Sequence, residues 1–290
     1  MNNPIKKPII ILGAPRSGTS ILGRILSQHK SLYYANEPRL IWRYMNDSRS
    51  DCLRVEHASE KCVDYIQRKF AKLVASEQKG RLLEKTPSSA LRIDFINKVF
   101  PDCKFIHIIR NGYDSTLSIR NFWDSHVGGI AQGKIDQKDS ILMQRLKEMH
   151  PTQLPYYVGE LASRLIPSKL RRSRVPWGPR LPGMNQMVRD LGVLEVSALQ
   201  WKMCVEHAAL HGRQYGSDRY FECKLEDFDS NKMQDILKFC ELSEDTGVEK
   251  YINEHFVKGM SSKRKFSADE VCIANIRSLI EPTMDWLGYE

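Results

Sequence analysis

The spacing of apolar residues near the start of the chain predicts a strand followed by a helix. Residues 7–12 are mostly apolar and β-branched, a composition typical of a buried strand. After a glycine-containing turn, apolar residues recur from 21 to 26 at helical spacing. The order of strand, glycine turn and helix is that of the first half of a βαβ unit.

The same alternation continues through the first half of the chain. Short apolar segments predict strands at 81–84 and 103–109. We expect a helix capped by Ser88 or Ser89 after the first of these strands and a helix at 112–123 after the second. Strands that alternate with helices predict an α/β fold, in which helices flank a central parallel sheet in three layers.

The pattern changes between residues 125 and 190. Within this region, residues 163–183 hold six basic residues, four prolines and no acidic residue, which excludes a regular helix or a central strand. We interpret the region as a basic, proline-rich insertion or lid, anchored by apolar residues such as Trp177. Beyond it we expect a strand at 219–222 and helices at 191–212, 233–240 and 269–287. No internal repeat is visible, so we expect one domain over residues 1–290.

The amino-acid composition excludes some classes of protein but does not identify a binding partner. The 290 residues are 41% hydrophobic and 27% charged, which excludes collagen-like and intrinsically disordered chains. The formal charge of +9 predicts an anionic partner. No apolar run suits a membrane span or a signal peptide. The number of cysteines, seven, is odd and no two are spaced as C-x-x-C, so the sequence indicates neither a disulfide framework nor a zinc ribbon. We therefore expect a protein of the reducing cytoplasm, with binding at the inner face of a membrane as an alternative.

The turn at residues 13–20 (GAPRSGTS) has the outline of a phosphate-binding loop. Both glycines and the final hydroxyl of G-x-x-x-x-G-K-[ST] are present, but Thr19 stands where the lysine is expected. Arg16 can supply the missing positive charge. The strand at 104–109 leads into Arg110 rather than into a carboxylate that would help to hold magnesium. The sequence therefore predicts a phosphate site without a metal.

Three segments resemble sulfotransferases that use 3′-phosphoadenosine 5′-phosphosulfate (PAPS) as the donor. Residues 14–20 (APRSGTS) are similar to the family's 5′-phosphosulfate loop, and residues 108–118 (IIRNGYDSTLS) to its 3′-phosphate motif. Residues 84–87 (EKTP) resemble the Lys-Thr-Pro element of many bacterial and glycan-modifying members. Weaker likenesses, which extend the resemblance over nearly the whole chain, lie at 224–228, 263–266 and 287–289.

The resemblance implies a P-loop fold, with PAPS as the donor co-substrate and no required metal. Arg110 ends a predicted strand and Ser118 lies about two helical turns later, so both can reach one phosphate above the edge of the sheet. Arg16 and Lys85 would neutralise charge on the transferred group. The residues expected to bind the donor are Arg16, Ser17, Gly18, Thr19, Ser20, Arg110, Ser118, Lys263 and Arg264.

An acceptor hydroxyl also needs a general base. Cytosolic sulfotransferases typically have a histidine after Lys-Thr, where this chain has Pro87. The segment 36–38 (NEP) resembles the Glu-Pro element that carries a catalytic glutamate in glycan sulfotransferases and some bacterial ones. The resemblance therefore makes Glu37 the candidate base, with His126 in reserve. Carbohydrates, lipids and small alcohols all fit as acceptors.

Several alternatives stay open at this point. A P-loop nucleoside or nucleotide kinase would use ATP with magnesium, which Thr19 and Arg110 disfavour. A nucleic-acid-binding protein would fit the positive charge, but no recognition motif supports one. His207 and His211 fit an ordinary helix face better than a metal site. The basic residues of the insertion either contact an acidic or membrane-associated acceptor or are simply solvated: Lys169, Arg171, Arg172, Arg174 and Arg180. The oligomeric state is undetermined.

Overall fold

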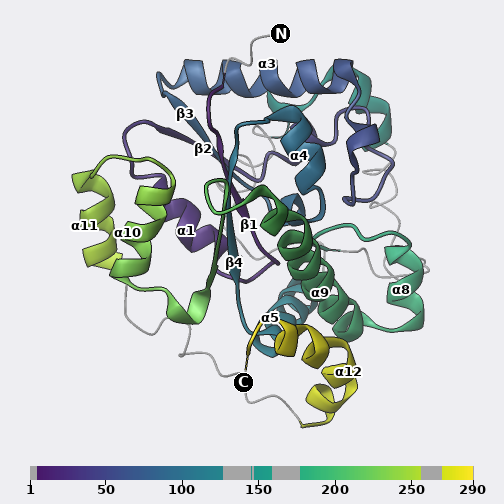
Figure 1. Ribbon diagram of the computed structural model, residues 1–290. Helices are drawn as coiled ribbons and strands as arrows, with labels where there is room; N and C mark the ends of the chain where they lie inside the picture. The colour runs from purple at the N-terminus through teal and green to yellow at the C-terminus, as the bar shows by residue number, and fades with distance from the viewer. Residues whose placement is uncertain (1–4, 127–144, 146, 159–176, 256–269, 290) are drawn as a thin grey trace.

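The chain folds around one parallel β-sheet that helices cover on both faces (Figure 1). This computed structural model describes residues 5–126, 145, 147–158, 177–255 and 270–289. Within these residues, five strands form a sheet in the order β2-β3-β1-β4-β5, and all neighbours are parallel. The α/β fold expected from the sequence is confirmed. The strands are β1 (Ile9–Leu12), β2 (Leu32–Asn36), β3 (Arg81–Lys85), β4 (Lys104–Ile109) and β5 (Tyr220–Lys224).

Alternate residues of the strands pack against two separate helical layers. Ile9 and Ile11 of β1 belong to a core shared with α1, α10 and α11, whereas Ile10 and Leu12 belong to a core shared with α3, α4, α5, α9 and α12. This alternation follows from the period of two along a strand. The helices are α1 (Thr19–Leu26), α2 (Arg39–Trp42), α3 (Glu60–Ser76), α4 (Ile93–Val99), α5 (Gly112–His126), α8 (Met184–Asp190), α9 (Val193–Gly212), α10 (Ser230–Phe239), α11 (Thr246–His255) and α12 (Glu270–Trp286).

Three elements lack a clear apolar run and were not expected from the sequence. β2 is an edge strand that is only partly buried, so its apolar pattern is weak. In α3, the buried residues Cys62, Ile66, Phe70 and Val74 recur every fourth position among charged ones, and the Ser59 hydroxyl caps the helix. α11 is similarly amphipathic. Each of these elements becomes stable through one packed stripe rather than through a continuous hydrophobic segment.

The expected helix cap at Ser88 or Ser89 is wrong. Both residues lie in a 3-10 helix (Pro87–Leu91), and α4 begins at Ile93 without a side-chain cap. The Ser89 hydroxyl instead donates a hydrogen bond of 3.2 Å to the buried carboxylate of Glu84. A buried carboxylate needs such donors, so it recruits the serine that a helix end would otherwise use.

The predicted insertion falls largely outside the described residues, including Lys169, Arg171, Arg172 and Arg174. Arg180 is described, and it is not a solvated basic side chain. Its backbone N–H donates to Asp51 Oδ2 at 2.7 Å, and its guanidinium Nη1 donates to the carbonyl of Asp47 at 3.0 Å. Arg180 thus anchors the end of the predicted insertion to the segment that contains Asp47 and Asp51.

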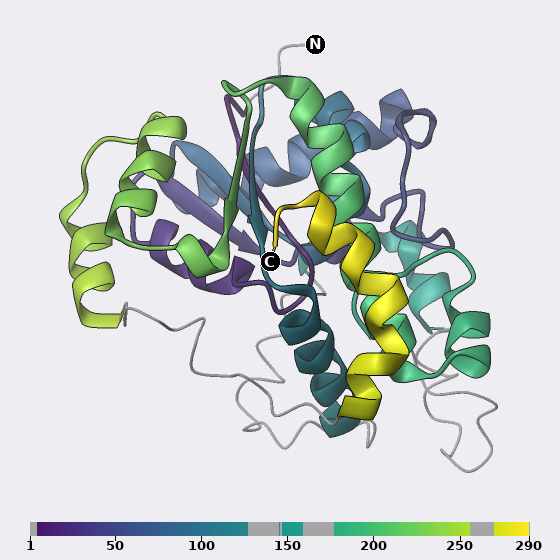
Figure 2. The same cartoon turned by 60° about the horizontal axis from the view of Figure 1, so that its bottom comes forward.

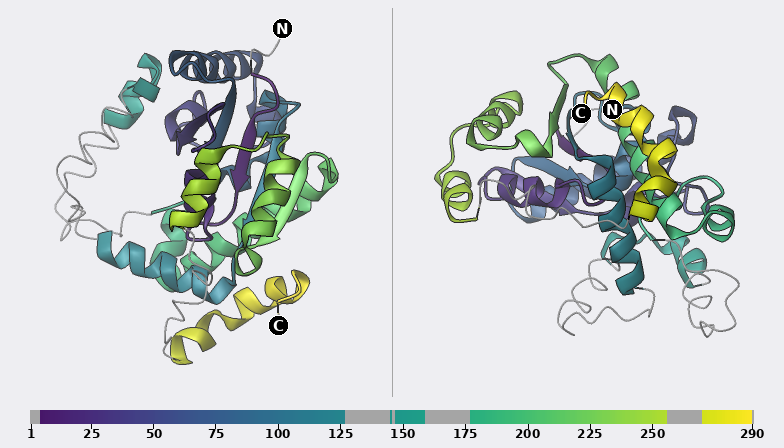
Figure 3. Two further views of the ribbon diagram at one scale, coloured as in Figure 1. Left: turned by 90° about the vertical axis from the view of Figure 1, so that its left-hand side faces the viewer. Right: turned by 90° about the horizontal axis from the view of Figure 1, so that it is seen from below.

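Because the strands are parallel, the segments that follow them meet at one edge of the sheet. Figure 3 (right panel) views the molecule from this side, and Figure 2 shows α5 and α12 side by side beyond the sheet. Open α/β sheets bind ligands at this edge. None of the helices in the described ranges combines the length and apolarity needed to cross a membrane.

Candidate functional site

A pocket of about 240 Å³ lies where the segments after β1, β2 and β3 meet. Its walls come from the phosphate loop, from the turn after β2, from the start of the 3-10 helix after β3, from α5 and from residues 177–179. The sequence-predicted residues Arg16, Thr19, Ser20 and Glu37 line it together. The fold therefore brings the candidate base to the predicted phosphate loop.

The phosphate loop leaves the start of α1 open to a ligand. Gly18 caps α1 with a left-handed φ of 89°, and among the described residues no side chain satisfies the first N–H groups of the helix. This φ strains any residue other than glycine, and a Cβ atom at Gly18 would also lie 2.6 Å from Leu225 Cδ1, so the position favours glycine. The buried Ser17 hydroxyl likewise has no hydrogen-bond partner in the described part of the chain. Free N–H groups and the helix dipole make this end of α1 suited to an anion.

Three residues from the two predicted phosphate motifs converge beside this loop. Arg16 Nε donates to Ser118 Oγ at 3.0 Å, and Arg110 Nη1 donates to the Arg16 carbonyl at 3.1 Å. Arg110 also pairs with Asp114 at 3.3 Å. Its buried Nε has no partner among the described residues. This arrangement can bind a second phosphate, because the Nε–H of Arg110 is a hydrogen-bond donor that the described residues leave unused and a guanidinium group matches the geometry of phosphate oxygens.

Glu37 is held between two cations at the end of β2. Lys85 Nζ lies 3.0 Å from Glu37 Oε1, and Arg39 Nη2 lies 2.6 Å from Oε2. The register of the sheet explains the first contact, because Asn36 of β2 is opposite Lys85 of β3. Burial alone would raise the pKa of Glu37, but Arg39 and Lys85 outweigh it and lower the pKa to about 2. The carboxylate is therefore ionised at neutral pH.

The backbone of Glu37 is also fixed, and in a strained conformation. Its φ is 56°, in the left-handed region that residues other than glycine rarely adopt. Its N–H donates to the carbonyl of Lys85 at 2.8 Å, and its own carbonyl accepts from Arg145 Nη1 at 2.8 Å. Arg145 is paired in turn with Glu148 at 3.1 Å. Sequence reasoning missed Arg39 and Arg145, and the second has no local signal because it lies 108 residues from Glu37.

An aromatic wall closes one side of the pocket. The rings of Phe122 on α5 and Trp177 lie 4.4 Å apart, centroid to centroid, at an interplanar angle of 39°. The Arg16 guanidinium lies 5.7 Å from the centre of the Phe122 ring. The wall therefore borders the residue expected to hold the donor.

A second group of charges, buried deeper, supports the Lys-Thr-Pro segment. Glu84 accepts hydrogen bonds from the hydroxyls of Thr86 and Ser89, and burial raises its pKa to about 7. Nearby, Asp51 and three arginines form what we call the sealed cluster. Burial alone would raise the pKa of Asp51, but these arginines outweigh it and lower the pKa. Besides Asp51, the members of the sealed cluster are Arg43, Arg92 and Arg180.

The remaining sequence candidates divide into those that the structure places and those that it does not. Lys263 and Arg264 lie outside the described residues, as does the side chain of His126. Glu226, in the 224–228 segment, accepts from the Asn111 N–H at 2.9 Å and from the Tyr289 hydroxyl at 3.0 Å. The weaker likenesses at 224–228 and 287–289 are thus joined directly to the predicted 3′-phosphate motif.

The described residues show neither a disulfide framework nor a metal cluster. All seven cysteines are free thiols. No group of three or more His, Cys, Asp or Glu side chains suited to a metal occurs within the described ranges. The Nδ1 atoms of His207 and His211 bond to the carbonyl of Ala90 and to the carboxylate of Asp94. These histidines brace α9 against the segment around α4, as an ordinary helix face does.

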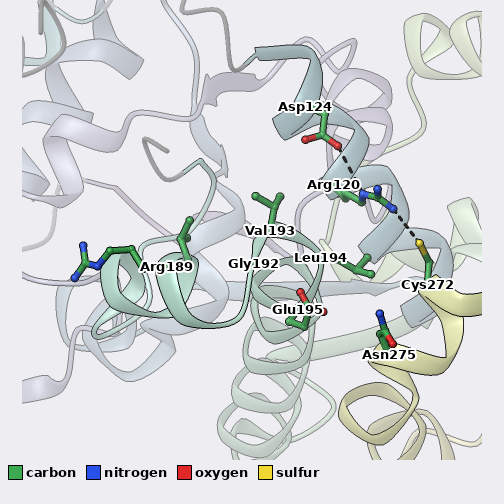
Figure 4. A pocket seen from close by; sticks show the side chains of 10 residues that line it. Arg120, Asp124, Arg189, Gly192, Val193, Leu194, Glu195, Cys272 and Asn275 are labelled. Atoms are coloured by element: carbon green, nitrogen blue, oxygen red, sulfur yellow. Dashed lines mark hydrogen bonds and ion pairs between the residues drawn. The ribbon is translucent and has the colours of Figure 1, made fainter. Parts of the chain in front are cut away.

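A larger hollow of about 880 Å³ lies between α5, α8, α9 and α12. Figure 4 shows Arg120 and Asp124 of α5 beside Cys272 and Asn275 of α12. The charge of Arg120 is already shared, because its Nε lies 3.6 Å from Asp124 and its Nη1 donates to Cys272 Sγ at 3.1 Å. None of the sequence-predicted site residues that the structure describes lines this hollow. The smaller pocket, not the larger one, therefore holds the candidate chemistry.

Comparison with known proteins places the fold and the motifs in one family. Two solved structures are similar over almost the whole chain: the sulfotransferase domain from the curacin biosynthetic pathway (TM-score 0.54, 14% identity, 99% of both chains) and that from the Synechococcus PCC 7002 olefin synthase (TM-score 0.51, 15% identity, 98% of this chain and 96% of the other). At these identities the likeness shows the fold alone.

Curated relatives match a shorter stretch. The nodulation protein NoeE of Sinorhizobium fredii (strain NBRC 101917 / NGR234) is 25% identical over 138 residues, 42% of this chain and 33% of that protein. Protein-tyrosine sulfotransferase 1 of Danio rerio is 27% identical over 122 residues, 38% of this chain and 34% of that protein. The chain thus spans about a third of the length of these two relatives. The family model described as "Sulfotransferase family" matches residues 8–154, half of the chain, and the chain belongs to this family.

Proposed function

We propose that this protein transfers a sulfuryl group from PAPS to an acceptor hydroxyl, with Glu37 as the general base. The observation that carries the proposal is the convergence of Arg16, Ser118 and Arg110 next to the pocket that contains Glu37. Arg16, Ser118 and Arg110 fit the phosphates at the two ends of the donor. Glu37 fits the reacting hydroxyl of the acceptor.

The donor-binding roles follow from where these groups lie. The open N–H groups of α1 and the Arg16 guanidinium would hold the 5′-phosphosulfate. Arg110 Nε and the Ser118 hydroxyl would hold the 3′-phosphate, with Lys263 and Arg264 expected to assist. Arg110 would loosen its pair with Asp114 as it engages the more highly charged phosphate.

In the transfer, the acceptor oxygen forms a bond to sulfur while the bond from sulfur to the bridging phosphate oxygen breaks. The bridging oxygen keeps the electron pair, and the proton of the acceptor hydroxyl passes to Glu37. Lys85 and the N–H groups of α1 would neutralise the charge that grows on the leaving oxygen. Lys85 would contact both the donor and the base, because its ammonium group already pairs with Glu37 at 3.0 Å. As Lys85 shifts toward the donor, the pKa of Glu37 rises from its low value, which makes the carboxylate a better base.

The alternative of a P-loop kinase has no support from the family match, and the residue after β4 is Arg110 rather than a carboxylate. Thermal-shift and calorimetric titrations of the full chain distinguish the two. We expect adenosine 3′,5′-bisphosphate (PAP) without metal to stabilise the protein, and ATP with magnesium to have little effect. Stabilisation by ATP with magnesium but not by PAP would overturn the proposal. Transfer of labelled sulfate from PAPS to a panel of alcohols, phenols and glycosides then tests turnover.

A further inference from the structure

The backbone of Trp177, a residue of the pocket lining, is held by a buried side chain that is not itself part of that lining. Gln200 of α9 is completely buried, and its Nε2 donates to the carbonyls of Trp177 at 2.7 Å and Pro179 at 3.0 Å. Between them, Gly178 has a left-handed φ of 86°, and a Cβ atom there would lie 2.8 Å from Gln200 Nε2. The turn at 177–179 is therefore fixed in one conformation, and Gln200 is the residue that positions it.

The side chain of Trp177 forms a rigid, half-exposed surface. One part of the ring packs on Phe122 at 4.4 Å, while residues 177–179 line the pocket. Trp177 loses little conformational entropy when a ligand binds, because its ring already packs on Phe122 and the Gln200 hydrogen bond holds its backbone. An aromatic face prepared in this way attracts the polarised C–H groups of a saturated ring.

Polar side chains also line the same pocket. Glu37, Arg39 and Ser88 line it, and the Arg39 Nε is buried without a hydrogen-bond partner among the described residues. An apolar alcohol or lipid chain would cover these groups without bonding them, which is costly. A small alcohol would reach Glu37 but leave Trp177 uncovered. A pyranose ring has an apolar face for Trp177 and hydroxyls for the polar side chains of the lining.

We propose that Trp177, fixed by Gln200, selects a saturated sugar ring as the acceptor; this inference rests on the proposed function. Its first test uses the protein saturated with PAP, so that no turnover is needed. Methyl glucopyranoside should change the tryptophan fluorescence of the wild type and of a Trp286→Phe control, but not that of Trp177→Phe. Trp286 is a matched control because it is an exposed tryptophan on α12 that does not line the pocket.

Steady-state kinetics with methyl glucopyranoside, hexanol and phenol give the second test. Trp177→Ala should raise the KM for the glycoside by about tenfold, which corresponds to the loss of one good contact. PAP affinity should stay within about twofold, since a change in acceptor binding alone leaves the donor site intact. Gln200→Leu should also raise the KM for the glycoside. Trp177→Phe, which keeps an aromatic ring, should have a KM for the glycoside close to that of the wild type.

Two outcomes would overturn the inference. One is a preference of the wild type for phenol or hexanol over the glycoside, and the other is an equal rise in KM for all three acceptors in Trp177→Ala. Failure of the proposed function is distinguishable. The protein would then not bind PAP, while a glycoside-dependent fluorescence change confined to Trp177 and measured without PAP would still support the sugar site.

Discussion

The short helix α2 links two clusters of charge that differ in their exposure to solvent. At its start, Arg39 pairs with Glu37, and both side chains are 28% exposed. Directly after its end, Arg43 pairs with Asp51, and these side chains are only 11% and 2% exposed. Both clusters contain a carboxylate surrounded by cations. Only the first opens into the pocket.

The difference in burial indicates that the two clusters have different roles. A partly solvated ion pair contributes little to stability, so the strained backbone of Glu37 and its polar contacts are better explained by the need to aim a carboxylate. In the sealed cluster, removal of one partner leaves charges in a medium that solvates them poorly. The cluster around Glu37 should therefore control turnover, and the sealed cluster should control folding.

Glu37→Gln gives the largest expected effect. Turnover should fall by about a thousandfold, because a positioned general base is worth that order of rate. PAP affinity should change little, since the amide keeps the shape of the side chain. Thermal stability should fall modestly, because Lys85, whose side chain is only 2% exposed, loses its countercharge. Labelled-sulfate transfer and calorimetry measure both quantities, with Glu56→Gln, an exposed carboxylate paired to Arg54, as the control. Full activity of Glu37→Gln would remove this residue from the mechanism.

Asp51→Asn tests the sealed cluster. It should lower the free energy of unfolding by about 3 kcal/mol, because Arg43, Arg92 and Arg180 lose their shared countercharge. Urea denaturation measures the change, and Asp190→Asn on the exposed surface of α8 is the control. An unfolding free energy equal to that of the wild type would show that the sealed cluster does not control folding.

Glu84→Gln tests a third carboxylate, which is buried, through the pH dependence of its effect on stability. The folded-state pKa of Glu84 is raised to about 7 by burial, whereas 4.5 is its ordinary value. Its contribution to stability is therefore present below pH 4.5 and is lost as the pH rises through 7. Between pH 5 and 8, the stability of Glu84→Gln relative to the wild type should rise by about 2 kcal/mol. A pH-independent difference between the two proteins would contradict the assignment.

Arg110→Ala separates the donor site from both clusters. It should weaken PAP binding by at least about tenfold, the cost of losing a charge-assisted hydrogen bond, while binding of 5′-AMP changes far less. Calorimetry with both nucleotides measures the ratio. Equal losses for PAP and 5′-AMP would mean that Arg110 does not recognise the 3′-phosphate.

The parts of the fold that the sequence predicted are those with strong local signals. β1 and β4 are completely buried, so they read as continuous apolar runs, and the glycine turn before α1 has a characteristic composition. The edge strand β2 and the helix α3 lack such runs, because each buries only one side. Their identity depended on what packs against them.

The candidate site shows the same division. Residues 13–20 and 108–118 determine by themselves a turn, a helix start and an arginine at a strand end, because these features depend on glycine conformation and on local spacing. The tertiary structure alone decided that Lys85, 48 residues from Glu37, and Arg145, 108 residues from it, would hold that carboxylate. It also decided that Gln200 would fix Trp177 above the pocket. Such contacts arise from strand order and helix packing, which no short stretch of sequence encodes.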